Sequence, residues 1–220
     1  MPLFILDDSP RFPPPEFARP DGLLAIGGDL SVPRLLSAYR KGIFPWYNEG
    51  EPILWWSPDP RLVLYPKELH VGRRLARTMR QKRFEITFDQ AFEEVINLCA
   101  KTRIDTGQGT WITREMIHAY TNLFQEGWCK STEAWQRGRL VGGLYGVQIG
   151  RVFFGESMFS TVRDASKVAF VETVKRLQER GVKLIDCQVP TRHLATFGAR
   201  LISRAKFLEE IERWTRSNPE

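Results

Sequence analysis

The sequence predicts an α+β protein made of a small proline-rich N-terminal domain and a larger C-terminal domain in which a mixed sheet is flanked by helices. Twelve of the fourteen prolines fall within the first 66 residues. Beyond them, segments with apolar residues at helical spacing alternate with short apolar segments typical of strands. A length of 220 residues suits one sizeable domain with a small appendage. We therefore expect domains over residues 1–63 and 64–220.

The N-terminal domain should be extended and rich in turns, because proline fixes φ and has no backbone donor. One short helix fits its sequence. Ser31 is a suitable N-cap for this helix, and Gly42 is a suitable end. Between them, Leu35, Leu36 and Tyr39 would lie on one face.

Four helices and three strands are expected in the C-terminal domain. Apolar stripes predict the helices, which begin at Asp89, lie between Thr113 and Gly127, and cover about residues 164–180 and 205–216. Largely apolar runs predict the strands, which cover residues 140–148, 151–155 and 183–189. The first two strands would form a hairpin that turns at residues 149–150.

The order of hairpin, long helix, strand and short helix resembles the acetyltransferase-like (GNAT-like) fold. Residues 191–199 resemble the loop and helix that follow the catalytic strand in that fold. The glycine-rich loop that binds the pyrophosphate of acetyl-CoA there has no counterpart at the start of the long helix. This absence disfavours acetyl-CoA as a donor.

Basic residues exceed acidic ones, which gives a formal net charge of +6 and a sequence pI of about 9.4. They concentrate in a basic run that consists of Arg73, Arg74, Arg77, Arg80, Lys82 and Arg83. A solvated helix face and a surface that contacts nucleic-acid phosphates explain this run equally well.

Several classes of protein are disfavoured. The N-terminus lacks the pattern of a signal peptide, and no apolar stretch is long enough to span a bilayer. Cys99, Cys129 and Cys187 stand far apart, which argues against a zinc site or a disulfide framework and fits a reducing cytosol. We therefore expect a cytoplasmic protein.

Motifs for metal, nucleotide and triad chemistry are also missing. The three histidines are isolated, and the sequence has no G-x-S-x-G elbow, no Walker A motif and no dinucleotide fingerprint. The Gly27-Gly28-Asp29 segment reads better as a turn than as an anion site. No cofactor and no metal are expected.

Two regions are chemically unusual. Residues 42–47 and 53–61 combine tryptophans with prolines, so they could form core or a rigid platform on which a base stacks. Asp186 and Gln188 lie two residues apart on a predicted strand and should point to the same face. Buried polar groups there need partners, which a structural network or a reaction centre would both provide.

Together these residues resemble the bacterial leucyl/phenylalanyl-tRNA–protein transferases. The matching blocks occur in the family's order over roughly residues 22–200; they are 22–30, 42–46, 55–61, 109–113, 155–160 and 184–188. The resemblance implies an aminoacyltransferase that moves Leu, Phe and, less readily, Met from aminoacyl-tRNA to proteins that begin with Arg or Lys. This addition marks them for degradation by the N-end rule pathway.

The resemblance also implies roles for individual residues. It places the 3′-terminal adenosine against Trp46 and Trp111 and the reaction centre at Glu156, Asp186 and Gln188. Within that centre, we expect Glu156 to hold the cationic Arg or Lys of the acceptor by charge-assisted hydrogen bonding. The aminoacyl pocket would be formed by Leu144, Phe153, Met158, Phe170 and Leu177. Leu144 is a departure, since some relatives have Met there. The basic run would contact the phosphates of the tRNA acceptor stem.

The implied reaction needs alignment more than a strong base, because the donor ester is already activated and an α-amino group has a pKa of about 8. Gln188 would orient the amine, and Asp186 would polarise that arrangement or take the proton, directly or through water. The leaving ribose hydroxyl is a further proton acceptor. Two other classes remain: another acyltransferase of the same fold, such as an acetyltransferase or a peptidoglycan aminoacyl transferase, and a non-catalytic RNA-binding module.

Overall fold

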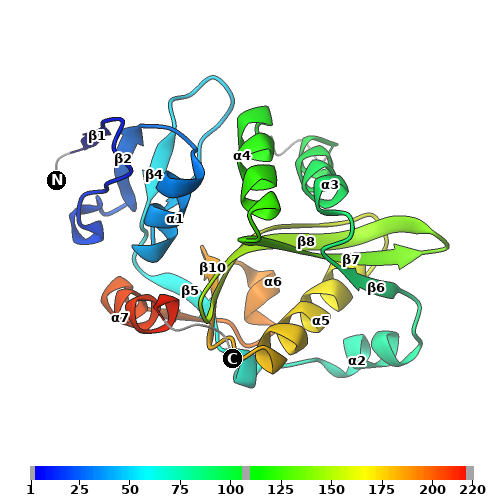
Figure 1. Cartoon of the computed structure of the whole chain (residues 1–220). Coiled ribbons are helices and arrows are strands. Elements are labelled where there is room, and N and C mark those ends of the chain that lie inside the picture. The colour runs from blue at the N-terminus through cyan, green and yellow to red at the C-terminus, as the bar shows by residue number, and fades with distance from the viewer. Residues whose placement is uncertain (1–2, 106–109, 217–220) are drawn as a thin grey trace.

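A computed structural model describes residues 3–105 and 110–216 of the protein. It contains a four-stranded sheet and a seven-stranded mixed sheet with helices packed around them (Figure 1). The predicted α+β class is therefore confirmed. The small sheet belongs to the N-terminal residues, and the large sheet carries most of the remaining chain.

The N-terminal part is extended and made of short elements, as its prolines predict. Its strands in spatial order are β1 (Phe4–Leu6), β2 (Leu23–Gly27), β4 (Leu54–Trp56) and β3 (Phe44–Pro45). A 3-10 helix, η1 (Pro15–Phe17), precedes β2. The predicted helix is confirmed as α1 (Val32–Arg40), which follows Ser31.

The turn after α1 requires glycine for two reasons. Gly42 has a φ of 69°, which residues with a side chain rarely adopt. A Cβ at this position would also come within 2.8 Å of the ring of Phe207 in the last helix, α7 (Arg204–Thr215). Gly42 therefore lets the C-terminal helix pack closely against the N-terminal domain.

The large sheet contains the predicted hairpin and the predicted third strand. Its spatial order is β11 (Arg200–Ile202), β5 (Arg61–Leu64), β10 (Leu184–Gln188), β9 (Val152–Ser160), β8 (Arg139–Ile149), β7 (Cys129–Gln136) and β6 (Glu85–Phe88). Only β9 and β10 pair in parallel among these neighbours. Because β5 pairs with β10, the expected boundary after residue 63 falls inside a strand of this sheet.

Helices cover both faces of the large sheet (Figure 1). The first face carries α3 (Phe92–Asp105) and α4 (Arg114–Gln125), and the second carries α2 (Arg73–Arg80), α5 (Ala165–Glu179) and α6 (Arg192–Ala195). A 3-10 helix, η2 (Pro66–Glu68), also packs against α5. No helix in the described parts of the chain is both long and apolar enough to cross a membrane.

The strands β6 and β7 have no counterpart among the predicted elements. The buried positions of β7 include Ser131 and Glu133, so the strand lacks an apolar signature. The Glu133 carboxylate accepts hydrogen bonds from the hydroxyls of Thr87 and Ser131 at 2.6 and 2.5 Å. These partners compensate for the buried charge, which hydrophobic patterning alone does not anticipate.

The start predicted for α3 is wrong by three residues. The helix begins at Phe92 rather than at Asp89. The Asp89 carboxylate accepts the backbone N–H of Ser131 at 2.8 Å and so ties the chain to β7. The residue also has a φ of 59°, which is incompatible with an α-helix.

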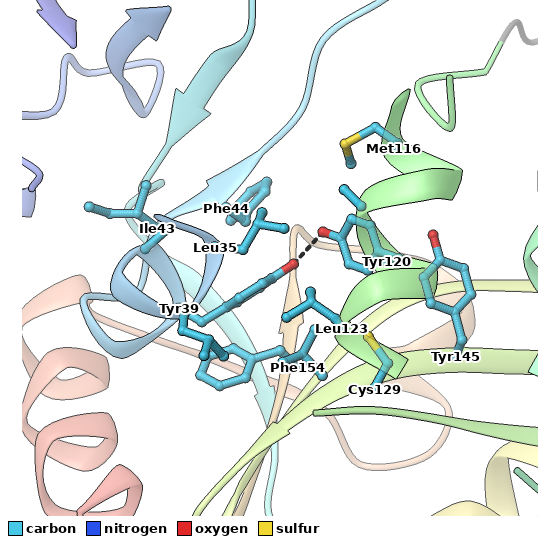
Figure 2. Packing of buried hydrophobic residues seen from close by; sticks show 14 of the residues in the cluster. Leu35, Tyr39, Ile43, Phe44, Met116, Tyr120, Leu123, Cys129, Tyr145 and Phe154 are labelled. Atoms are coloured by element: carbon cyan, nitrogen blue, oxygen red, sulfur yellow. Dashed lines mark hydrogen bonds between the residues drawn. The ribbon is translucent and has the colours of Figure 1, made fainter. Parts of the chain in front are cut away.

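The two domains share one apolar cluster. It runs from α1 and the small sheet to α3 and α4 on the first face of the large sheet. Figure 2 shows Tyr39 of α1 and Tyr120 of α4 meeting through their hydroxyl groups. The Tyr39 ring packs on Phe154 of β9 with ring centroids 5.0 Å apart. A second cluster fills the face under α5.

Candidate active site

A cavity of about 330 Å³ lies at the parallel pair of strands β9 and β10. Both domains contribute to its wall. Phe44, Pro45 and Trp46 come from the N-terminal domain, whereas the remaining lining residues come from the C-terminal domain. The structure brings together nine of the predicted site residues here: Trp46, Trp111, Leu144, Phe153, Glu156, Met158, Phe170, Asp186 and Gln188.

One part of this cavity is apolar. Leu144, Phe153, Met158 and Phe170 line it on the side of α5, where they belong to or pack against the second apolar cluster. Leu177 does not line this cavity. It is buried on the same helix as Phe170 and instead borders a separate cavity of about 20 Å³.

Two tryptophans lie on the side of the N-terminal domain. Trp46 follows β3 and is 44% exposed, although its ring packs on Trp56 with centroids 5.9 Å apart. The indole N–H of Trp56 donates to the carbonyl of Trp46 at 2.7 Å and fixes the loop. Trp111 is half-buried just before α4. Gly109, which belongs to the same predicted block, lies outside the described residues.

Glu156 occupies the centre of a buried hydrogen-bond network. The β8–β9 pairing shifts register beside it, since Tyr145 pairs with Ser157 and the next residue of β8 pairs with Gly155. The carboxyl group of Glu156 accepts hydrogen bonds from the hydroxyls of Tyr39 at 2.8 Å and Tyr120 at 3.1 Å. Burial raises the pKa of Glu156 to about 7, although the two tyrosine hydrogen bonds act in the opposite direction.

Asp186 is fully buried and paired with Arg61 of β5. The guanidinium donates Nε–H to Oδ1 at 2.8 Å and Nη2–H to Oδ2 at 2.7 Å. The rings of Phe44 and Phe207 lie 4.7 and 4.6 Å from the guanidinium carbon of Arg61. Both oxygens of the Asp186 carboxylate are therefore occupied by one arginine.

Gln188 connects the two buried carboxyl groups. Its backbone N–H donates to Oδ1 of Asp186 at 2.9 Å, and its side-chain Nε2 donates to Oε1 of Glu156 at 3.1 Å. The β10–β5 pairing shifts register between Asp186 and Gln188, and Gln188 has a φ of 61°. Both residues line the cavity, but their side chains have different partners.

The basic run does not line this cavity. Its first four arginines lie on α2, and Lys82 and Arg83 follow in the next turn; all six side chains are exposed. The helix packs against α5 and buries Leu75. Within the described residues, none of the six forms an ion pair.

Models of known protein families match most of the chain. A model described as "Leucyl/phenylalanyl-tRNA protein transferase" matches residues 63–212, and one for the N-terminal domain of the same proteins matches residues 28–59. The chain belongs to the leucyl/phenylalanyl-tRNA–protein transferase family. The resemblance inferred from the sequence is thereby confirmed, as is the assignment to an aminoacyltransferase family.

Relatives of the same name are similar over nearly the whole chain. The leucyl/phenylalanyl-tRNA–protein transferase of Anaeromyxobacter sp. (strain K) is 56% identical over 97% of this chain and 91% of its own. That of Stutzerimonas stutzeri (strain A1501) is 59% identical over 93% of this chain and 91% of its own.

Solved structures are similar at much lower identity. A conserved protein of unknown function from Bacteroides thetaiotaomicron has a TM-score of 0.50 at 13% identity and covers 78% of this chain and 62% of its own. A GCN5-related N-acetyltransferase from Kribbella flavida has a TM-score of 0.43 at 10% identity and covers 76% and 60%.

Three buried residues of this family member are absent from the site predicted by its sequence. They are Arg61, which holds Asp186, and the tyrosines Tyr39 and Tyr120, which hold Glu156. Arg61 had a detectable signal, because it is a charged residue at the start of the apolar run Arg61–Leu64 and a buried charge requires a partner. The tyrosines lie on apolar helix faces and carry no such signal.

Proposed function

We propose that this protein transfers Leu, Phe and, less readily, Met from aminoacyl-tRNA to the N-terminal Arg or Lys of acceptor proteins in the cytoplasm. The product is marked for degradation by the N-end rule pathway. The observation that carries this proposal is the cavity that joins an apolar pocket, two tryptophans and a buried carboxyl–glutamine pair in a member of this family.

The donor end of aminoacyl-tRNA occupies the apolar and aromatic parts of the cavity. Its side chain lies among Leu144, Phe153, Met158 and Phe170, because burying apolar surface favours Leu, Phe and Met over polar residues. The terminal adenine stacks on Trp46 and Trp111, a contact that typically contributes about 1 to 3 kcal/mol per base.

The rest of the tRNA binds through charge. The six exposed side chains of the basic run face solvent without ion-pair partners in the described chain, so they are free to contact phosphates. Contacts of this kind supply affinity without reading the nucleotide sequence. They suit an enzyme that accepts more than one tRNA.

The acceptor binds on the side of Glu156. The carboxylate form of Glu156 holds the cationic Arg or Lys side chain, and the amide oxygen of Gln188 accepts a hydrogen bond from the α-amine. The amide group of Gln188 already donates through Nε2 to Glu156, which leaves its oxygen for the amine. With its pKa near 7, Glu156 changes charge in the physiological range.

The reaction forms a peptide bond and breaks the ester bond to the ribose. The free amine attacks the ester carbonyl, and the proton that the nitrogen loses goes to the leaving ribose oxygen, directly or through water. Both carboxylate oxygens of Asp186 accept hydrogen bonds from Arg61, which favours an orienting role for Asp186 over proton uptake. Alignment of the two substrates supplies most of the acceleration.

Transfer of labelled Phe from Phe-tRNA to a peptide that begins with Arg tests the proposal. Matched peptides that begin with Glu, or with an N-acetylated Arg, are the controls. We expect label on the Arg peptide alone. The Gln188→Ala variant should transfer much more slowly, whereas Gln178→Ala, which changes an exposed glutamine of α5, should match the wild type. Equal labelling of the three peptides, or of none, would refute the proposal.

A further inference from the structure

The buried side chain of Arg61 is held by hydrogen bonds and by two aromatic rings. It is 1% exposed, makes two hydrogen bonds to Asp186, and lies between the rings of Phe44 and Phe207. Its remaining nitrogen, Nη1, has no hydrogen-bond partner in the described part of the chain. A buried ion pair of this kind gives little net stability compared with apolar residues of the same volume. Its geometry therefore calls for an explanation other than stability.

That geometry continues directly into Gln188. Oδ1 of Asp186 accepts both Nε–H of Arg61 and the backbone N–H of Gln188. Gln188 holds a left-handed φ of 61°, a conformation that residues other than glycine keep only when their surroundings enforce it. This backbone conformation places the Gln188 amide at 3.1 Å from Glu156.

We propose that Arg61 is a positioning residue for the transfer reaction. Through Asp186 it fixes the backbone of Gln188, so that the side-chain amide points its nitrogen at Glu156 and its oxygen at the acceptor amine. Phe44 and Phe207 keep the guanidinium in the plane that this arrangement needs. The inference rests on the proposed function, but the hydrogen bonds that it concerns exist without substrate.

The first test compares Arg61→Lys with Arg34→Lys. Arg34 is a matched control, since it is fully buried, pairs with Asp29 at 3.1 Å and does not line the cavity. Lysine cannot make the bidentate contact that Arg61 makes with Asp186, and at either position it places an ammonium where a larger planar guanidinium is buried. Both variants should therefore lose thermal stability. Only Arg61→Lys should lower kcat, by roughly a hundredfold, because angstrom-scale misplacement of an aligning group costs on that order. Its KM for Phe-tRNA should stay near the wild-type value.

The second test reports the position of Gln188 without any activity. The side-chain amide resonances of ¹⁵N-glutamine-labelled protein are recorded, and the signal of Gln188 is assigned by its loss in Gln188→Ala. We expect this signal to move in Arg61→Lys and in Asp186→Asn, which keeps the side-chain volume, but not in Arg34→Lys. If Arg61→Lys does not fold, Asp186→Asn takes its place in this test.

The outcomes separate the two proposals. A Gln188 signal that stays in place in both site variants, or an equal loss of kcat in Arg61→Lys and Arg34→Lys, would overturn the positioning role of Arg61. A wild-type protein that transfers no Phe would refute the proposed function alone, because a displaced Gln188 signal would still demonstrate the connection from Arg61.

Discussion

At the scale of single residues, Glu156 combines burial with a change of charge near neutral pH. The residue is 7% exposed, and burial raises the pKa of its carboxyl group from 4.5 to about 7. In the unfolded chain the same group ionises near its ordinary value. Between these two values the unfolded state releases a proton that the folded state keeps, so the free energy of unfolding falls as pH rises.

Replacing Glu156 by Gln should remove this pH dependence. Relative to the wild type, Glu156→Gln should gain stability progressively from about pH 4.5 to pH 7 and no further above it. The gain should approach roughly 3 kcal/mol, since one pKa unit corresponds to about 1.4 kcal/mol. Denaturant unfolding of both proteins at several pH values measures it. Parallel stability curves across this range would contradict the burial of an ionisable Glu156.

Residue identities at the site could be predicted from the sequence, but their partners could not. Nine of the predicted residues meet in one cavity, and six of them, all but Leu144, Phe153 and Phe170, belong to the family blocks. The pairing of Arg61 with Asp186 joins residues 125 positions apart, and that of Tyr39 with Glu156 joins residues 117 apart. Spacing along the chain contains no information on such contacts. Leu177 shows the same limit. The helix that carries it is predicted correctly, but its side chain lies outside the cavity to which the prediction assigns it.

At the scale of elements, the helix α2 uses different residues for packing and for its exposed, charged surface. Leu75 alone is buried on this helix, while its four arginines point to solvent. Because no residue of α2 lines the cavity, we expect substitutions on this helix to affect the binding of a whole tRNA but not that of a short donor. This difference provides an internal control.

Alanine at Arg73, Arg74, Arg77 and Arg80 should weaken the binding of Phe-tRNA and flatten its salt dependence. Each lost phosphate contact should reduce the slope of log K against log salt by about 0.7 to 0.9. Use of a minimal donor, Phe esterified to adenosine, should not change. The helix itself should persist, because alanine favours helices.

A charge-matched control uses exposed residues of other elements, Arg137, Arg139, Lys175 and Arg180, replaced by alanine. Both quadruple variants lower the formal net charge from +6 by four, to +2. A loss of slope in the control but not in the α2 variant would place the tRNA on another surface.

Elements with a local apolar signature could be predicted, and those defined by distant partners could not. The helices α1, α4, α5 and α7 and the hairpin of β8 and β9 have such signatures. The strand β7 is instead paired with β6 and receives a hydrogen bond from Thr87 of β6 to the buried Glu133, a contact that exists only after the chain has folded. Asp89 shows the same limit, since its bond to Ser131 displaces the start of α3.

At the scale of the whole molecule, the two domains are joined by a continuous core. The cluster that contains Leu35 and Ile43 of the N-terminal domain also contains Tyr120 and Phe154 of the C-terminal domain (Figure 2). Tyr39 connects the two through hydrogen bonds to Tyr120 and Glu156. Neither domain can therefore lose its packing without exposing apolar surface of the other.

The protein should accordingly unfold in one transition. Three of the seven tryptophans, Trp46, Trp55 and Trp56, lie in the N-terminal domain and the other four in the C-terminal domain. Fluorescence therefore reports both domains, while far-UV circular dichroism reports mainly the C-terminal domain, which holds most of the helices and strands. The two signals should change at the same denaturant concentration. Tyr39→Phe should lower the free energy of unfolding by about 1 to 3 kcal/mol, and with it this midpoint, without separating the two signals. An earlier fluorescence transition would show independent domains.

The contact of Phe207 with Arg61 also has a consequence for biosynthesis. The ribosome makes Arg61 early and Phe207 late, and N-terminal segments of a nascent chain generally begin to fold first. Until α7 emerges, one face of the Arg61 guanidinium and the surface beside Gly42 remain uncovered. We therefore expect the packing around the Arg61–Asp186 pair to be completed, and the proposed transfer activity to appear, only after α7 has docked.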